Sequence, residues 1–239
     1  MVFWEDAPLF TARSAAHRQQ TGRPYVTLTY AQSLDGAIAA RPGHPLALSC
    51  RESQTMTHGL RAAHDAILVG IGTVLADDPS LTVRLVEGHN PQPIILDSRL
   101  RFPPYAKLLQ HATHVPWIIT STEASWDRQT TLENLGARVH RLPTGGNGGI
   151  DLVSLLAMLG EGGLDSLMVE GGAQIITSFL SYRLVDQLIV TIAPVLVGGV
   201  RVLDVHHLPR PNGLPRLKNV LYQRIGVDLV VRGEPDWQV

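Results

Sequence analysis

The chain has 239 residues, enough to bury a substantial core, and we expect one large α/β domain rather than two small ones. Its formal net charge of −1, with 17% charged residues, gives no general attraction to nucleic acid or to a membrane surface. The lone cysteine, Cys50, excludes an internal disulfide and a cysteine cluster for zinc, and it fits a reducing cytoplasm. The first residues do not resemble a secretory signal, and the longest apolar run, residues 188–200, is too short to span a bilayer. We therefore expect a soluble, cytoplasmic protein that binds small molecules, with no nucleic acid and no membrane as partners.

The N-terminal part of the chain is predicted to contain a surface element, a strand and a helix. Residues 1–23 have no sustained hydrophobic period and are interpreted as a short helix or an arm on the surface. Residues 25–31 alternate in polarity and are rich in β-branched side chains, which favours a strand. Ser49, followed three residues later by Glu52, is a capping-box pattern that predicts the start of a helix through Ala63.

Arg61, near the end of this helix, has two interpretations. It is either a clamp for a phosphate or a solvated arginine that stabilises the negative end of the helix. Most of the 20 basic residues are arginines, which favours bidentate capture of an anionic ligand.

A buried strand, residues 66–69, leads into Gly70-Ile-Gly-Thr73. This segment is a partial dinucleotide-binding turn, because Leu75 stands in place of the third glycine. Asp77-Asp-Pro79 follows, and it is typical of a turn or a helix terminus, since aspartate bonds its own backbone and proline stops a helix. The alternative is that one carboxylate faces a ligand. Arg84 then adds a second arginine to this region.

The remaining elements alternate between strands and helices. Residues 100–114 are expected to be irregular because Pro103-Pro104 forbids a long helix, and the prolines at positions 209, 211 and 215 indicate an exposed loop. Further predicted elements are strands at 93–98 and 116–120, a helix end capped by Gly136 with a strand up to residue 142, a helix capped by Asp151, and strands at 185–193 and 219–231. This order predicts a mostly parallel sheet covered on both faces, with antiparallel strands at the C-terminus.

Residues 166–178, Ser-Leu-Met-Val-Glu-Gly-Gly-Ala-Gln-Ile-Ile-Thr-Ser, are predicted to form a buried strand, a tight turn and the start of a helix. Gly171 and Gly172 permit backbone dihedral angles closed to other residues, so that the helix begins at once. The free amide groups of such a helix suit a phosphate, and Glu170 would lie beside them at the carboxyl end of the strand. The alternative is an ordinary α/β turn with no ligand.

Several standard sites are excluded. The sequence contains no G-x-S-x-G elbow, no Walker A motif and no H-E-x-x-H motif. His58 and His64 are six residues apart and lack carboxylates at zinc spacing, so we interpret them as surface or helix-end histidines and expect no metal site. The remaining glycine turns, carboxylates and arginines suit a phosphorylated cofactor together with a phosphorylated substrate.

Four segments carry a resemblance to a known family: residues 26–36, 56–61, 64–79 and 169–173. They resemble the pyrimidine reductases of riboflavin biosynthesis, whose fold is similar to that of dihydrofolate reductase. The resemblance implies a three-layer α/β/α domain over residues 24–239, with residues 1–23 as an N-terminal arm. Thr29 stands where the bacterial pattern has a lysine, so the chain is more similar to the stand-alone fungal and archaeal enzymes.

The resemblance implies NADPH-dependent reduction of 2,5-diamino-6-ribosylamino-4(3H)-pyrimidinone 5′-phosphate to the ribitylamino product. The alternatives are the deaminated substrate 5-amino-6-(5-phosphoribosylamino)uracil, a related reductase of another pterin or pyrimidine, and an NADP-binding module without turnover. A homodimer is also implied, and we expect the apolar region 188–200 to form its interface.

The family's functional residues carry over to matching positions of this sequence. Glu170 and Asp77 are expected as the catalytic carboxylates, and Arg61, Arg84 and Glu170 are expected to contact the substrate. The expected cofactor-binding residues are Thr73, Asp77, Ser98, Gly171, Gly172, Ala173, Gln174 and Ile175.

Overall fold

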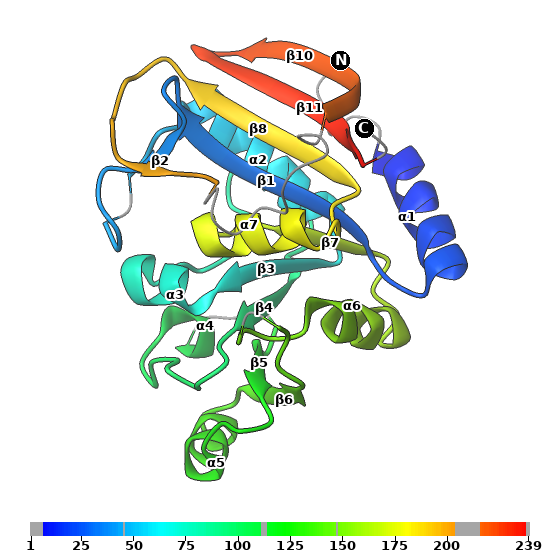
Figure 1. Ribbon diagram of the computed structural model, residues 1–239, viewed down its shortest axis with the longest axis vertical. Helices are drawn as coiled ribbons and strands as arrows, with labels where there is room; N and C mark the ends of the chain where they lie inside the picture. The colour runs from blue at the N-terminus through cyan, green and yellow to red at the C-terminus, as the bar shows by residue number, and fades with distance from the viewer. Residues whose placement is uncertain (1–6, 45, 111–113, 147, 204–215, 238–239) are drawn as a thin grey trace.

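The computed structural model describes residues 7–44, 46–110, 114–146, 148–203 and 216–237. These residues form a central sheet with the strand order β10-β11-β8-β1-β7-β3-β4-β5-β6, so that β10 and β6 lie at its two edges (Figure 1). The parallel strands are β1 (Tyr25–Ser33), β3 (Ala66–Gly70), β4 (Gln92–Leu96), β5 (Trp117–Ser121), β6 (Arg138–Leu142), β7 (Ser166–Val169) and β8 (Gln187–Ala193). The antiparallel strands are β10 (Arg216–Ile225) and β11 (Asp228–Asp236), and a separate small sheet joins β2 (Ala37–Ala39) to β9 (Val200–Arg201).

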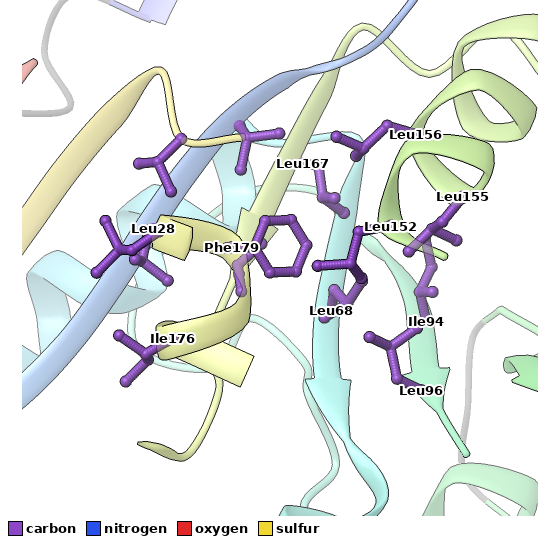
Figure 2. Close-up of a cluster of buried hydrophobic side chains, with 14 of the residues drawn as sticks. Leu28, Leu68, Ile94, Leu96, Leu152, Leu155, Leu156, Leu167, Ile176 and Phe179 are labelled. Atoms are coloured by element: carbon purple, nitrogen blue, oxygen red, sulfur yellow. The ribbon is translucent and has the colours of Figure 1, made fainter. Parts of the chain in front are cut away.

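Helices cover both faces of this sheet because successive strand side chains point to opposite sides. They are α1 (Ala7–Thr21), α2 (Arg51–Ala63), α3 (Ile71–Asp77), α4 (Lys107–Gln110), α5 (Trp126–Asn134), α6 (Leu152–Glu161) and α7 (Ala173–Ser181). On one face, α6 and α7 cover strand residues such as Leu68 and Leu167, with Phe179 of α7 among them (Figure 2). On the other face, Ile67 packs in a second cluster with α3 and α5, and Met168 packs against α2. The predicted mostly parallel sheet, covered on both faces and with antiparallel C-terminal strands, is confirmed.

Residues 7–21, expected to form a short helix or a surface arm, form helix α1, which packs on the body of the protein. The Phe10 ring lies 4.6 Å from the His64 ring and 5.8 Å from that of Tyr25, and Ser14 is buried. Arg18 forms an ion pair with Asp165, which precedes β7. Helix α1 is therefore joined to α2, β1 and the start of β7.

The capping box expected at Ser49 and Glu52 is wrong. Helix α2 begins at Arg51, and its N-cap residue is Cys50, whose side chain makes no capping hydrogen bond. Instead, Asp228 Oδ2 accepts a hydrogen bond of 2.9 Å from the Cys50 amide, across 178 positions of sequence. Asp228 is buried beside the start of α2, where the helix dipole favours a negative charge. A carboxylate from a distant strand thus replaces the local cap.

The other element predictions agree with the structure in most places. Asp151 caps α6 by accepting from the Val153 amide, and Gly136 has a φ of 93° just after α5. In the described residues of the expected irregular segment, the one regular element is the four-residue helix α4. The prolines at 209, 211 and 215 lie outside the described residues. Among the helices of the described part of the chain, none is long and apolar enough to cross a membrane.

Candidate active site

The two glycine turns meet at the carboxyl edge of the sheet. Strands β3 and β7 are parallel neighbours, with Leu68 opposite Val169, so the turn after β3 lies beside the turn after β7. A Cβ atom placed on Gly70 would lie 3.0 Å from Ile175 Cγ1, which shows how closely the start of α3 approaches α7. This is the edge at which parallel sheets hold their ligands.

Neither glycine after β7 is needed for unusual dihedral angles, so that part of the expectation is wrong, and only Gly171 is needed for space. Neither Gly171 nor Gly172 has a positive φ. A Cβ on Gly171 would lie 2.4 Å from Ile175 Cβ, which is too close for any other residue. Gly172 is the N-cap of α7, with φ −74° and ψ 178°, and a Cβ there would meet no atom within 4 Å. The space in front of α7 is therefore open.

The first turn of α7 has free amide groups, as expected. The Ile176 amide donates to the Gly172 carbonyl, so the amides of Ala173, Gln174 and Ile175 precede the first helical hydrogen bond. The N-cap residue, Gly172, has no side chain to cap this end of the helix. The positive end of the α7 dipole is thus available to an anion.

Arg61 and Glu170 form a bidentate ion pair. Arg61 Nε donates to Glu170 Oε1 and Nη2 donates to Oε2, both at 2.7 Å, and the two side chains are 13% and 19% exposed. Desolvation opposes the charge on Arg61, but the attraction and hydrogen bonding of Glu170 outweigh it and raise the pKa of Arg61. The alternative of a solvated arginine is therefore wrong.

Glu170 and the start of α7 share one edge of the sheet but face different layers. Met168, two residues earlier, packs against α2, and Glu170 turns to the same side to reach Arg61 of α2. Helix α7 covers the opposite face, where its Phe179 lies among the leucines of the strands (Figure 2). Strand alternation thus sends the carboxylate to the layer of α2, while the amides at the start of α7 belong to the layer on the other face.

A pocket of about 290 Å³ opens next to the ion pair. Its lining residues are Arg61, Asp77, Asp78, Pro79, Ser80, Leu81, Arg84 and Lys107. It brings together three of the predicted site residues, Arg61, Asp77 and Arg84, whereas Glu170 contacts Arg61 without lining the pocket. Lys107 was not predicted to belong to the site, because it lies in the short helix α4 and reaches the pocket only through the tertiary fold.

The two aspartates at the end of α3 have different roles. Asp78 is the C-cap of α3, with a left-handed φ of 41°, and its Oδ1 accepts from the Lys107 amide at 2.9 Å. The helix-terminus interpretation is confirmed for this residue. Asp77 is exposed in the pocket wall, where partial desolvation raises its pKa, so its carboxyl group holds a proton more readily than an ordinary aspartate.

His58 and His64 were expected on the surface or at a helix end; both are buried, so the surface interpretation is wrong, whereas the helix-end interpretation is confirmed for His64, the C-cap of α2. His58, within the helix, is 7% exposed, and its Nδ1 accepts a hydrogen bond of 2.9 Å from the Arg84 amide. Burial, reinforced by the charges of Arg61 and Arg84 and opposed by Glu170, lowers its pKa to about 4. His64 is the C-cap of α2, and its Nδ1 and Nε2 contact Leu60 O and Thr27 Oγ1.

Of the predicted cofactor residues, only Asp77 lines the pocket; those of the α7 turn, together with Thr73 and Ser98, lie outside its wall. Thr73 is half-buried in α3, and Ser98 follows β4, where its carbonyl accepts from Ser121 Oγ at 2.9 Å. Both stand at the same carboxyl edge as the glycine turns. In the described part of the chain, no group of three or more His, Cys, Asp or Glu residues could hold a metal ion.

Comparison with known proteins gives a consistent result. The family model described as RibD C-terminal domain matches residues 24–231. The 2,5-diamino-6-ribosylamino-4(3H)-pyrimidinone 5′-phosphate reductase of Debaryomyces hansenii is 43% identical over 211 residues, covering 80% of this chain and 83% of that protein.

Solved structures agree. The riboflavin biosynthesis reductase Rib7 of Saccharomyces cerevisiae has 31% identity and a TM-score of 0.74, covering 97% of this chain and all of that one. Acinetobacter baumannii RibD has 26% identity and a TM-score of 0.80. The matched region covers 94% of this chain but only 61% of that protein. Dihydrofolate reductase of Enterococcus faecalis, at 12% identity and a TM-score of 0.51 over 89% of this chain and 96% of that one, shares the fold. The chain therefore belongs to the RibD C-terminal domain family and has a dihydrofolate-reductase-like fold.

Proposed function

We propose that the chain reduces the ribosyl group of 2,5-diamino-6-ribosylamino-4(3H)-pyrimidinone 5′-phosphate to the ribitylamino group, with NADPH, in riboflavin biosynthesis. Family membership supports an oxidoreductase of this pathway. The observation that carries the proposal is the Arg61–Glu170 pair beside a pocket that also contains Asp77 and Arg84. This site combines a fixed carboxylate with cations for a phosphorylated substrate.

The residues at the start of α7 fit a nicotinamide cofactor. Gly172 leaves open space in front of the helix, and the amides of Ala173, Gln174 and Ile175 can bind a pyrophosphate. Thr73, Asp77 and Ser98 stand at the neighbouring strand ends and would complete the cofactor site. When bound, the cofactor would supply the hydride for the former anomeric carbon.

The substrate must open to an imine, whose carbon accepts the hydride and whose nitrogen takes a proton. Glu170 accepts two bonds from Arg61, which suits a fixed negative charge that stabilises the cationic iminium better than it suits a proton donor. Asp77, whose pKa is raised, is better suited to deliver the proton.

Arg84 is the better candidate for the substrate phosphate. Arg61 already donates to Glu170 and, through Nη1, to the Thr82 carbonyl at 3.2 Å. Arg84 is exposed in the pocket wall and donates to Thr82 Oγ1 at 3.0 Å, which leaves most of its guanidinium donors for a ligand. Arg61 therefore contacts the substrate as part of the pair with Glu170, while Arg84 binds the phosphate.

The test is a turnover assay that follows NADPH absorbance with each of the two pyrimidines. We expect oxidation with the diaminated substrate and much slower oxidation with 5-amino-6-(5-phosphoribosylamino)uracil. Faster oxidation with 5-amino-6-(5-phosphoribosylamino)uracil would show that the uracil, and not the diamino compound, is the substrate. Binding of NADPH without oxidation by either compound would refute the enzyme and leave an NADP-binding module.

We further propose a homodimer, on the basis of the family resemblance. Much of region 188–200 is buried inside the subunit as β8, and its exposed apolar side chains are Val195 and Leu196, at 42% and 72%. We therefore narrow the proposed interface to the turn after β8. Light scattering that shows a monomer would refute it.

A further inference from the structure

The segment of residues 82–84, which carries Arg84 into the pocket, is held by side chains from elsewhere. It belongs to no helix or strand, so its main chain has no regular hydrogen-bonding partner. The three contacts are Arg61 Nη1 to Thr82 O (3.2 Å), Val83 N to Asn90 Oδ1 (2.7 Å) and Arg84 N to His58 Nδ1 (2.9 Å). The path of this segment therefore depends on the side chains that bond it.

The contact with His58 specifies the state of the imidazole. A backbone amide only donates, so His58 Nδ1 must be the acceptor and the ring proton must be on Nε2. The ring is buried, and its lowered pKa of about 4 agrees with a neutral imidazole at physiological pH.

Helix α2 thus fixes two parts of the proposed site from one side. His58 and Arg61 are three residues apart and so are neighbours on the helix surface, while Met56 and Leu60 face the core. Arg61 holds Glu170, and His58 holds the main chain of Arg84.

We propose that His58 is a positioning residue for substrate binding. By accepting the Arg84 amide, it fixes the main chain from which the Arg84 guanidinium reaches the pocket. The inference rests on the proposed function, because the ligand of Arg84 would be the substrate phosphate.

The test compares His58→Leu, which removes the acceptor, with His58→Asn, whose amide oxygen can replace Nδ1. We expect His58→Leu to raise the KM for the pyrimidine roughly tenfold, with a much smaller change in kcat and in the KM for NADPH. His58→Asn should restore most of the affinity. In an Arg84→Ala background, His58→Leu should cause no further rise, because the group that it positions is missing. An equal rise in both backgrounds would overturn the proposal.

A matched control is His64→Leu, since His64 is also buried at α2 but contacts Leu60 and Thr27. We expect it to lower the thermal stability and leave KM unchanged. Hydrogen exchange at the Arg84 amide provides a readout that does not need turnover. Exchange should become faster in His58→Leu and return toward the native rate in His58→Asn; unchanged exchange would overturn the positioning role even if the enzyme has another substrate.

Discussion

The ion pair between Arg61 and Glu170 allows a quantitative test by a double-mutant cycle. The cycle consists of Arg61→Ala, Glu170→Gln and the double variant. Arg61→Ala leaves Glu170 without two hydrogen bonds, and Glu170→Gln leaves Arg61 with a single neutral acceptor in place of the carboxylate. Both changes occur in a largely desolvated place, where the side chains are 13% and 19% exposed. The double variant removes the interaction without leaving a charge unpaired.

The size of the coupling follows from the geometry. Each 2.7 Å contact is charge-assisted and contributes about 1.5–3 kcal/mol, so two contacts set an upper limit of about 6 kcal/mol. The cost of desolvating both ions offsets part of this, and we expect a coupling of about 3 kcal/mol in the free energy of unfolding.

The assays are urea denaturation and steady-state kinetics. Glu170→Gln should lower kcat by a factor of about 10² or more, because it removes the negative charge that would stabilise the iminium. Arg61→Ala should lower kcat/KM strongly in the native background and only slightly in the Glu170→Gln background, because its effect on turnover acts through the carboxylate.

A second bidentate pair, Arg23 with Asp186, has contacts of 2.6 and 2.7 Å at the opposite end of β1 and serves as a control. Arg23→Ala should reduce stability without changing kcat/KM. If Arg61→Ala behaves in the same way, or if the effects of Arg61→Ala and Glu170→Gln simply add, the reasoning is refuted.

Three further outcomes follow from the geometry. Gly171→Ala should destabilise the protein by about 1–3 kcal/mol through its clash with Ile175, which thermal denaturation measures. Gly172→Ala should fold normally and weaken NADPH binding, which a fluorescence titration measures. His64 should make stability fall as the pH drops from 6.5 to about 4, by about 1.4 kcal/mol per pH unit, because only the unfolded chain binds its proton there. His64→Gln should flatten this slope in urea denaturation, and an unchanged slope would contradict the burial argument. At pH values above the raised pKa of Asp77, its ionisation destabilises the folded state, so Asp77→Asn should slightly increase the free energy of unfolding there. The same variant should lower kcat, and an unchanged kcat would remove Asp77 from the mechanism.

The element pattern of this protein could be predicted from local signals. Short apolar runs around Leu68 and Leu167, glycine after α5 and the Asp151 cap each act over a few residues, so the strands, helices and mostly parallel order were predictable. The cap of α2 was not, because its carboxylate comes from Asp228, 178 positions away.

The sequence by itself determined the fold class, the family motifs and the candidates Arg61, Asp77, Arg84 and Glu170. Only the tertiary structure decided that Arg61 reaches Glu170 across 109 positions, that His58 is a buried acceptor and that Lys107 lines the pocket. The physical reason is that propensities, caps and alternation depend on neighbouring residues, whereas an ion pair or a buried hydrogen bond depends on which elements the packed sheet brings together.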